Sequence, residues 1–210
     1  SIMKLNSYAE MKSKVGTRMG AIELTPTDRQ LLLYDIFKGS QQVELADITS
    51  RLPMGRKMIQ RDMKTLVDAG LMEVCYCAKQ KAYIVKNHMP CALAENTLGQ
   101  KSRKYLHLSK LNRIGRLMNE LYTETGSYYW ECGDDYYSCK DCYYELFPNA
   151  NERMRQRDFA QLNRIGYTVF YDNTFRRYKM WECSNLREDF GVYQENGKLM
   201  RRMDLEYDLY

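Results

Sequence analysis

The feature that most constrains this chain is an internal repeat. The segments Met58–Gly70 and Met154–Gly166 align without a gap, and Met, Gln-Arg-Asp, Leu and Gly match at one constant offset. Six matches in thirteen positions are hard to obtain by chance. Because two copies are fewer than a solenoid needs, we expect two tandem domains of the same type.

The surroundings of the first copy predict three helices followed by two strands. The first helix begins near Pro26-Thr27-Asp28 and stops at Gly39, with apolar residues at helical spacing between them. Gly70 ends the third helix as a left-handed cap. The remaining elements are a helix over 45–52, a turn at 53–55, a helix over 56–69 and strands over 71–76 and 82–85.

The second copy predicts the same order of elements. Asn151 is a good N-cap for its third helix. The loop before its short helix is longer than in the first copy and carries aromatic and acidic residues. The elements are helices over 108–122, 139–147 and 151–165, and strands over 167–171 and 177–181 around an Asp172-Asn173-Thr174 turn.

This order of elements is typical of a winged helix-turn-helix. We therefore expect an α+β protein, mainly α with small β-hairpins, built as two tandem winged helix-turn-helix domains. Asn196-Gly197 predicts the turn of a further hairpin near the C-terminus. The expected divisions are an arm or helix over 1–24, the first domain over 25–87, a basic linker over 88–107, the second domain over 108–183, and a hairpin and tail over 184–210.

The stretch Arg56–Asp62, followed by Leu66 and Gly70-Leu71, resembles the helix-turn-helix of DeoR-type bacterial regulators and of the N-terminal domain of WYL-domain regulators. The resemblance covers residues 25–87 and, more weakly, 108–182. It implies a DNA-binding transcription regulator that occupies a promoter site. The sensor domains of both families have no counterpart in these residues, so no ligand-sensing function carries over.

A recognition helix in the major groove reads bases with residues near its N-terminus. Arg and Gln make bidentate base contacts, whereas Lys more often binds phosphate. The DNA-contacting candidates in the first copy are Arg56, Lys57, Gln60, Arg61 and Lys64, with Lys79 and Lys81 on the wing. Those in the second copy are Arg153, Arg155, Gln156 and Arg157, with Arg176 and Arg177 on the wing. The alternatives are a solvated basic helix face and, for the second copy, a dimerisation or scaffold domain; Glu152 there would repel phosphate or accept from cytosine.

The aspartates of the two Arg-Asp pairs are expected to be structural. Neighbouring residues do not face each other on a helix, so Asp62 and Asp158 are expected to anchor another element of their domain. Arg61 and Arg157 remain open between phosphate clamps and intramolecular ion-pair partners. The basic run Lys101, Arg103, Lys104, Lys110, Arg113 and Arg116 is either a track along phosphates or the polar face of a helix.

Cysteines and aromatic residues gather before the second recognition helix. Cys139 and Cys142 form a C-x-x-C with Cys132 nearby, but no second pair completes a zinc site, so buried core cysteines are favoured over a metal or thiol sensor. We predict no metal and no cofactor. The aromatic loop over 128–144 and the C-terminal segment are the candidates for a homodimer interface.

Composition and charge are compatible with a regulator or with an adaptor. The formal net charge is +5, which permits a nucleic-acid partner. No run approaches the roughly 20 apolar residues of a membrane helix, so a cytoplasmic protein is expected. Two histidines and the lack of a catalytic constellation argue against an enzyme. We expect a sequence-specific regulator of double-stranded DNA; the alternative is a protein-interaction adaptor in which the winged helices bind partners.

Overall fold

The computed structural model describes residues 19–88, 90, 91, 93, 102–121, 138–180 and 190–204. Within these residues it contains six helices and three small antiparallel sheets. The expected α+β class is confirmed. No helix in this part of the chain is long and apolar enough to cross a membrane.

The first unit comprises residues 26–87. Its helices are α2 (Pro26–Phe37), α3 (Leu45–Arg51) and α4 (Arg56–Asp68), and its strands are β2 (Gln42–Glu44), β3 (Glu73–Cys77) and β4 (Ala82–Asn87). Thr25 and Asp28 cap α2 reciprocally, since each side chain bonds the backbone N–H of the other residue. The strands form one sheet in the order β2-β4-β3. Strand β2 was not predicted, because three residues are too few to establish an alternating pattern.

The second unit comprises residues 103–121 and 138–180. Its helices are α5 (Arg103–Glu120), α6 (Cys139–Leu146) and α7 (Glu152–Arg164), and its strands are β5 (Val169–Asp172) and β6 (Arg177–Met180). Asn151 caps α7 as predicted, because its side chain accepts from the Met154 N–H. The Asp172 side chain accepts from the amides of Thr174 and Phe175, which confirms the predicted turn.

A third sheet joins the two ends of the described chain. Strand β8 (Lys198–Asp204) pairs with both β7 (Val192–Glu195) and β1 (Met19–Glu23). Asn196 and Gly197 both have positive φ (51° and 76°), as the predicted hairpin turn requires. Residues 19–23 were expected to belong to an arm or helix but form a strand. The pairing was not predicted because β1 and β8 lie at opposite ends of the sequence.

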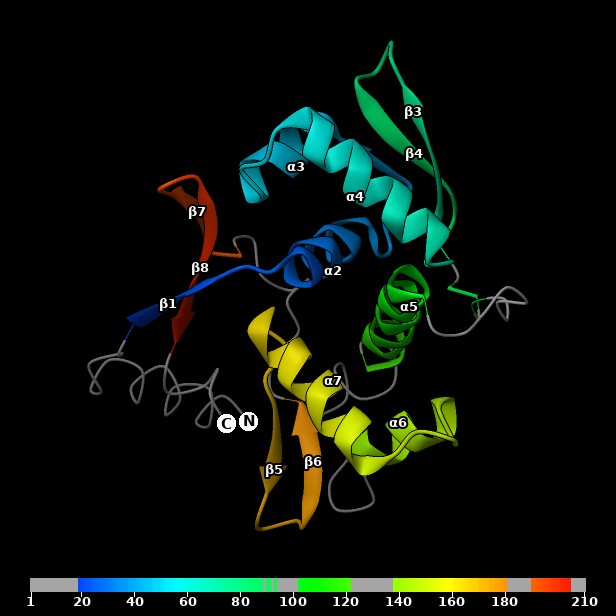
Figure 1. Ribbon diagram of the computed structural model, residues 1–210, viewed down its shortest axis with the longest axis vertical. Helices are drawn as coiled ribbons and strands as arrows, with labels where there is room; N and C mark the ends of the chain where they lie inside the picture. Colours follow the sequence, from blue (N-terminus) through cyan, green and yellow to red (C-terminus); the bar gives the residue numbers. More distant parts are fainter. Residues whose placement is uncertain are drawn as a thin grey trace, which may run out of the picture.

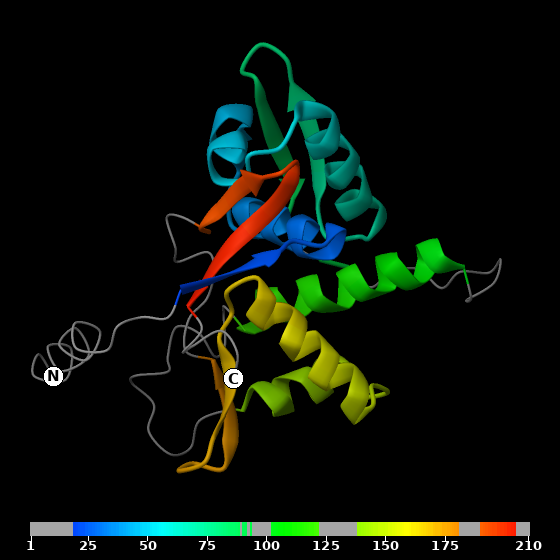
Figure 2. The same ribbon diagram turned by 60° about the vertical axis from the view of Figure 1, so that its left-hand side comes forward.

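The two units pack against each other over one continuous apolar core. Figure 2 shows α5 lying between the helices of the first unit and the other two helices of the second unit. Gly115 of α5 permits this approach, since a Cβ there would meet the Leu71 side chain at 2.4 Å. The last five residues of the expected linker, 103–107, are the first turns of α5. Figure 1 shows the β3–β4 and β5–β6 hairpins at opposite ends of the long axis.

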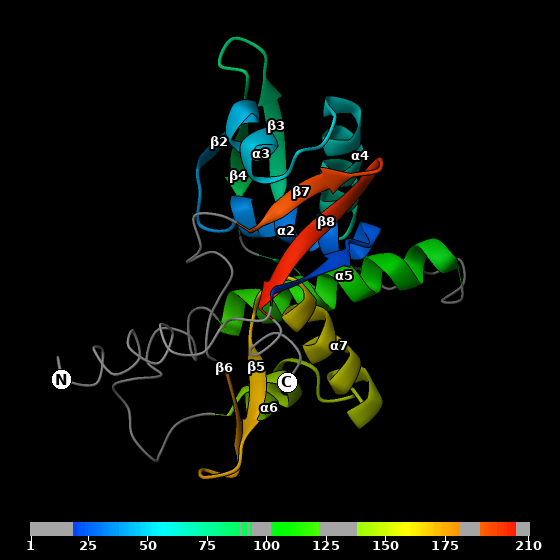
Figure 3. The ribbon, with the colours of Figure 1, turned by 90° about the vertical axis from the view of Figure 1, so that its left-hand side faces the viewer.

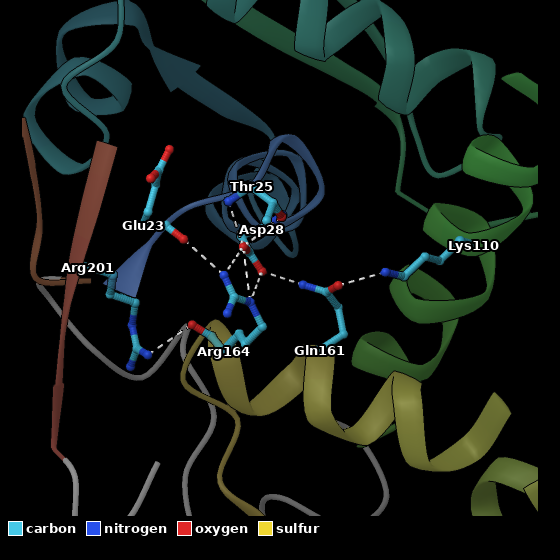
Figure 4. A network of polar contacts seen from close by, with 7 residues as sticks. All are labelled: Glu23, Thr25, Asp28, Lys110, Gln161, Arg164 and Arg201. Carbon is cyan, nitrogen blue, oxygen red and sulfur yellow. Dashed lines mark hydrogen bonds and ion pairs between the residues drawn. The ribbon is translucent and has the colours of Figure 1, made fainter. Parts of the chain in front are cut away.

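A polar network also joins the units, centred on Asp28 at the start of α2 (Figure 4). The fully buried Asp28 carboxylate accepts from Arg164 Nη2 (2.8 Å) and from the Gln161 amide, both on α7. Lys110 of α5 donates to Gln161 Oε1 (2.7 Å), and burial lowers the pKa of this lysine. Arg201 of β8 donates to the Arg164 carbonyl (3.0 Å), which ties the third sheet to the same point.

Candidate nucleic-acid interface

Helix α4 presents one apolar and one basic face. Ile59, Met63 and Leu66 repeat at helical spacing and are buried against the core. The opposite face carries five exposed polar side chains, which are those of Arg56, Lys57, Gln60, Arg61 and Lys64. All five sequence-predicted residues of this helix therefore lie on one accessible surface.

The four cations of this face are available for a ligand. No ion pair within the described part of the chain engages Arg56, Lys57, Arg61 or Lys64. The Arg56 guanidinium lies 5.1 Å from the ring centre of Tyr76 in β3, so helix and hairpin are in contact.

The β3–β4 hairpin extends the same unit with two lysines. Lys79 and Lys81 are both exposed at its turn, and Lys81 has a positive φ of 50°. Figure 3 shows this hairpin projecting beyond α3 and α4. The predicted wing lysines thus lie at the far end of the first unit.

Asp62 clamps α4 to α2. Its buried carboxylate accepts from Arg29 Nε (2.5 Å), Arg29 Nη2 (3.0 Å) and Gln30 Nε2 (3.0 Å). The predicted structural role is confirmed. The arginine partner lies 33 residues earlier in the chain, and the adjacent Arg61 stays on the exposed face.

Asp158 clamps α7 to α5 in the same way. It accepts from Arg113 Nε (2.5 Å) and Nη2 (2.9 Å), and from the Tyr143 hydroxyl of α6 (2.8 Å). Burial and the Asp158 charge raise the pKa of Tyr143, so the phenol stays protonated. The predicted anchoring role is confirmed here too. Arg157 is exposed and makes no ion pair with any described residue, so the ion-pair interpretation of Arg61 and Arg157 finds no support.

Arg155 does not lie on the outer face of α7. Its side chain is 1% exposed, and its guanidinium lies against the rings of Phe159 and Tyr178, at 4.8 and 4.3 Å from their centres. Its guanidinium donates to Glu152 and to the Tyr178 hydroxyl. We therefore remove Arg155 from the interface. The repeat alignment indicates this buried position, because Arg155 aligns with the core residue Ile59.

Glu152 places a persistent negative charge at the start of α7. Hydrogen bonds from Arg155 and from the Tyr144 hydroxyl lower the pKa of Glu152 to about 2. Gln156 also donates to this carboxylate (3.3 Å). Arg153 and Arg157 remain exposed beside it, so the outer face of α7 is less positive than that of α4.

The β5–β6 hairpin carries exposed rings as well as cations. Arg176 is exposed with a positive φ of 53°, and the half-buried Arg177 lies 5.7 Å from the Phe175 ring centre. Lys179 lies 3.6 Å from the same centre and pairs with Asp172 (3.0 Å). Phe175 and Tyr171 are 41% and 46% exposed. Both predicted wing arginines are thus near the tip.

The basic run before and along α5 is mostly engaged inside the protein. Lys110 and Arg113 face α7, Arg116 lies over the Phe147 ring (5.1 Å), and Lys104 pairs with Asp68 (3.5 Å). Lys101 is outside the described residues. Of the two alternatives for this run, these contacts favour the polar helix face over the phosphate track.

The cysteine prediction is partly tested. Cys139 and Cys142 are 1% and 4% exposed in the common core, as predicted for core cysteines. Tyr143 is buried beside them, so this part of 128–144 is not an exposed interface. Residues 128–137, including Cys132, lie outside the described residues. Across the described ranges, no cluster of metal-ligating side chains is found.

Comparison with known proteins gives no relative for this arrangement. No protein-family model, curated sequence or solved structure matches the chain.

Proposed function

We propose that the protein is a double-stranded DNA-binding transcription regulator, and that its two units are tandem winged helix-turn-helix domains. In the first unit, α4 is the recognition helix and the β3–β4 hairpin is the wing. The observation that carries the proposal is the outer face of α4, where Gln60 lies together with four cations that form no ion pair with any described residue. The DeoR-type resemblance of the same residues agrees with this assignment.

The electrostatics of the first unit suit a polyanionic duplex. The acidic residue at the centre of α4, Asp62, is buried and neutralised by Arg29, so it does not oppose a phosphate backbone. Arg56 and Gln60 are near the N-terminal end of the helix, where base contacts are made. Lys79 and Lys81 would contact the backbone beyond the major groove.

The test is selection from a random pool of short duplexes at two salt concentrations, with sequencing of the bound fraction. We expect an enriched motif and weaker binding at high salt, because bound cations release counterions from DNA. Arg56→Ala should cost about 1–3 kcal/mol of affinity for the enriched site with the fold intact. Affinity that does not change with salt would contradict the proposal.

The second candidate function is an adaptor in which the second unit binds a protein. It is favoured by the buried Arg155 and the anionic Glu152, which make α7 a poor copy of α4. Binding that survives Arg56→Ala and Arg61→Ala unchanged, with no enriched duplex, would support it.

A further inference from the structure

Residues of α7 line a groove together with residues of β1, β5, β6 and β8. Its volume is about 420 Å³, within the range of sites for small planar groups. Gln156 and Ala160 of α7 and Tyr178 of β6 are among its lining residues. Ile22 of β1 and Met203 of β8 border it on the side of the third sheet.

Two aromatic residues, Phe159 and Tyr178, are among those that line the groove. Phe159 and Tyr178 pack edge to face with ring centres 5.5 Å apart, and Tyr171 continues the series at 5.2 Å from Tyr178. The Arg155 guanidinium is fixed against two of these rings. Tyr171, which pairs with Tyr178 across the β5–β6 hairpin, is 46% exposed. The half-buried Tyr178 is the ring of the groove lining that a flat base could reach, because Phe159 is only 5% exposed and the Arg155 side chain 1%.

The rim of the groove is positive. Arg153 precedes Gln156 by three residues and Arg157 precedes Ala160 by three, so both arginines lie beside the groove on the helix surface. Both are exposed and make no ion pair with a described residue. Arg176 adds an exposed cation at the hairpin tip. Single-stranded nucleic acid has flat bases and a phosphate backbone, so it matches the aromatic rings of the groove and the positive charges at its rim.

A base pair within a duplex does not match it. Reading a major groove needs side chains that project from a convex helix, whereas α7 has Ala160 at the position of Lys64 and is bordered by the third sheet. We propose that this groove binds single-stranded nucleic acid, with an unstacked base against Tyr178 and the backbone along Arg153 and Arg157. This site is independent of the duplex site proposed on α4.

The test measures fluorescence anisotropy of the full chain with a labelled oligothymidylate of about eight nucleotides, within the site size of such proteins. An abasic strand of equal length and charge is the reference. We expect the oligothymidylate to bind at least about tenfold more tightly, because stacking of a single base contributes on that order. Oligouridylate in the same assay separates a DNA site from one that also takes RNA.

Variants separate stacking from charge. Ala160→Phe fills the groove without changing any charge and should reduce oligothymidylate affinity to the abasic level. Ala46→Phe, at an exposed alanine of α3, is the matched control and should have no effect. Arg157→Ala should weaken both strands equally. Ala160→Leu serves as a smaller filling variant if the Phe variant folds poorly.

Two results would overturn the proposal. One is equal affinity for the abasic strand and the oligothymidylate, and the other is wild-type binding by folded Ala160→Phe. Duplex affinity measured on the same samples keeps the two sites distinct, because Arg61→Ala should lower it and Ala160→Phe should not. Loss of single-strand binding in Arg61→Ala alone would assign that binding to α4 and also refute the groove.

Discussion

Helices α4 and α7 have the same length and the same internal clamp but different surfaces. Each has thirteen residues and buries an aspartate that accepts two hydrogen bonds from an arginine of the first helix of its unit. Along the outer face, however, Arg56 aligns with Glu152 and Lys64 with Ala160. The comparison teaches that the clamp holds the shared fold, while the surface is free to take another ligand.

The ends of the two helices are also alike. Gly70 and Gly166 both have positive φ (71° and 100°), as a left-handed cap requires. The residue after each glycine donates to a carbonyl five residues earlier, at 3.2 Å in the first unit and 3.1 Å in the second. Between these two helices, the difference therefore lies in single side chains.

The first prediction, which has the largest expected effect, replaces the buried Ile59 of α4 by arginine, the residue at the aligned position of α7. Ile59→Arg places a guanidinium at a fully buried position where the residue three earlier is Arg56 rather than a glutamate. We expect a loss of about 4 kcal/mol or more in the free energy of unfolding, because the buried charge has no partner. Urea denaturation measures it.

The matched variants make this test specific. Adding Arg56→Glu to Ile59→Arg supplies the acid that Glu152 provides in the second unit, and should recover part of the loss. Arg155→Ile should cost only about 1 kcal/mol or less, because an apolar side chain replaces a paired ion and Glu152 remains half exposed. Equal costs for Ile59→Arg and Arg155→Ile would contradict the comparison.

These positions also show what the sequence could and could not predict. The two repeat copies and their surroundings predict the six helices of the described residues and two hairpins, and Asn196-Gly197 predicts the third hairpin, because periodic apolar residues and turn residues are local signals. It also predicts that Asp62 and Asp158 are structural. It does not reveal Arg29 and Arg113 as their partners, since both lie on other helices. For the site, the face of α4 was predicted in full, whereas Arg155 was wrongly assigned to the outer face of α7, although its helical spacing groups it with the buried Asp158 and Phe159.

The second prediction concerns the shared clamp. Asp62→Ala and Asp158→Ala should each lower the free energy of unfolding by about 3 kcal/mol, because each leaves a largely buried arginine unpaired. Chemical denaturation of both variants checks this, with the exposed Asp141→Ala as control. A cost that is large in only one unit would mean that the two clamps are not equivalent.

The third prediction concerns the last residue of each helix, which faces the other unit. Arg164 of α7 reaches the buried Asp28, whereas the aligned Asp68 of α4 pairs with Lys104, whose side chain is 76% exposed. Arg164→Ala should cost about 1–2 kcal/mol in the free energy of unfolding, reduced by the partial exposure of the arginine. Asp68→Ala should cost less than about 0.5 kcal/mol. Thermal denaturation of the two variants measures the contrast, and Arg153→Ala is a control on the same helix as Arg164.

The fourth prediction, which has the smallest expected effect, compares how stability depends on pH at the first residues of the two helices. The pKa of Glu152 falls to about 2 in the folded protein from an ordinary value of 4.5, through its bonds to Arg155 and Tyr144. A lowered acid pKa contributes stability that is fully present above pH 4.5 and is lost as the pH falls toward 2. Glu152→Gln lacks this contribution, so the variant should be less stable than wild type near neutral pH and approach it below pH 4.5.

Denaturation midpoints of both proteins, measured from neutral pH down to pH 2, give the difference directly. The many other carboxyl groups titrate in both proteins and cancel in that difference. Glu145→Gln removes an exposed glutamate of α6 that makes no ion pair with a described residue, and its curve should run parallel to wild type. Arg56, at the aligned position of α4, has no acid to titrate, so Arg56→Gln should show no such convergence. A constant gap between Glu152→Gln and wild type at every pH would mean that the carboxylate does not hold Arg155 through its charge, and that the contrast between α4 and α7 at this position is one of packing alone.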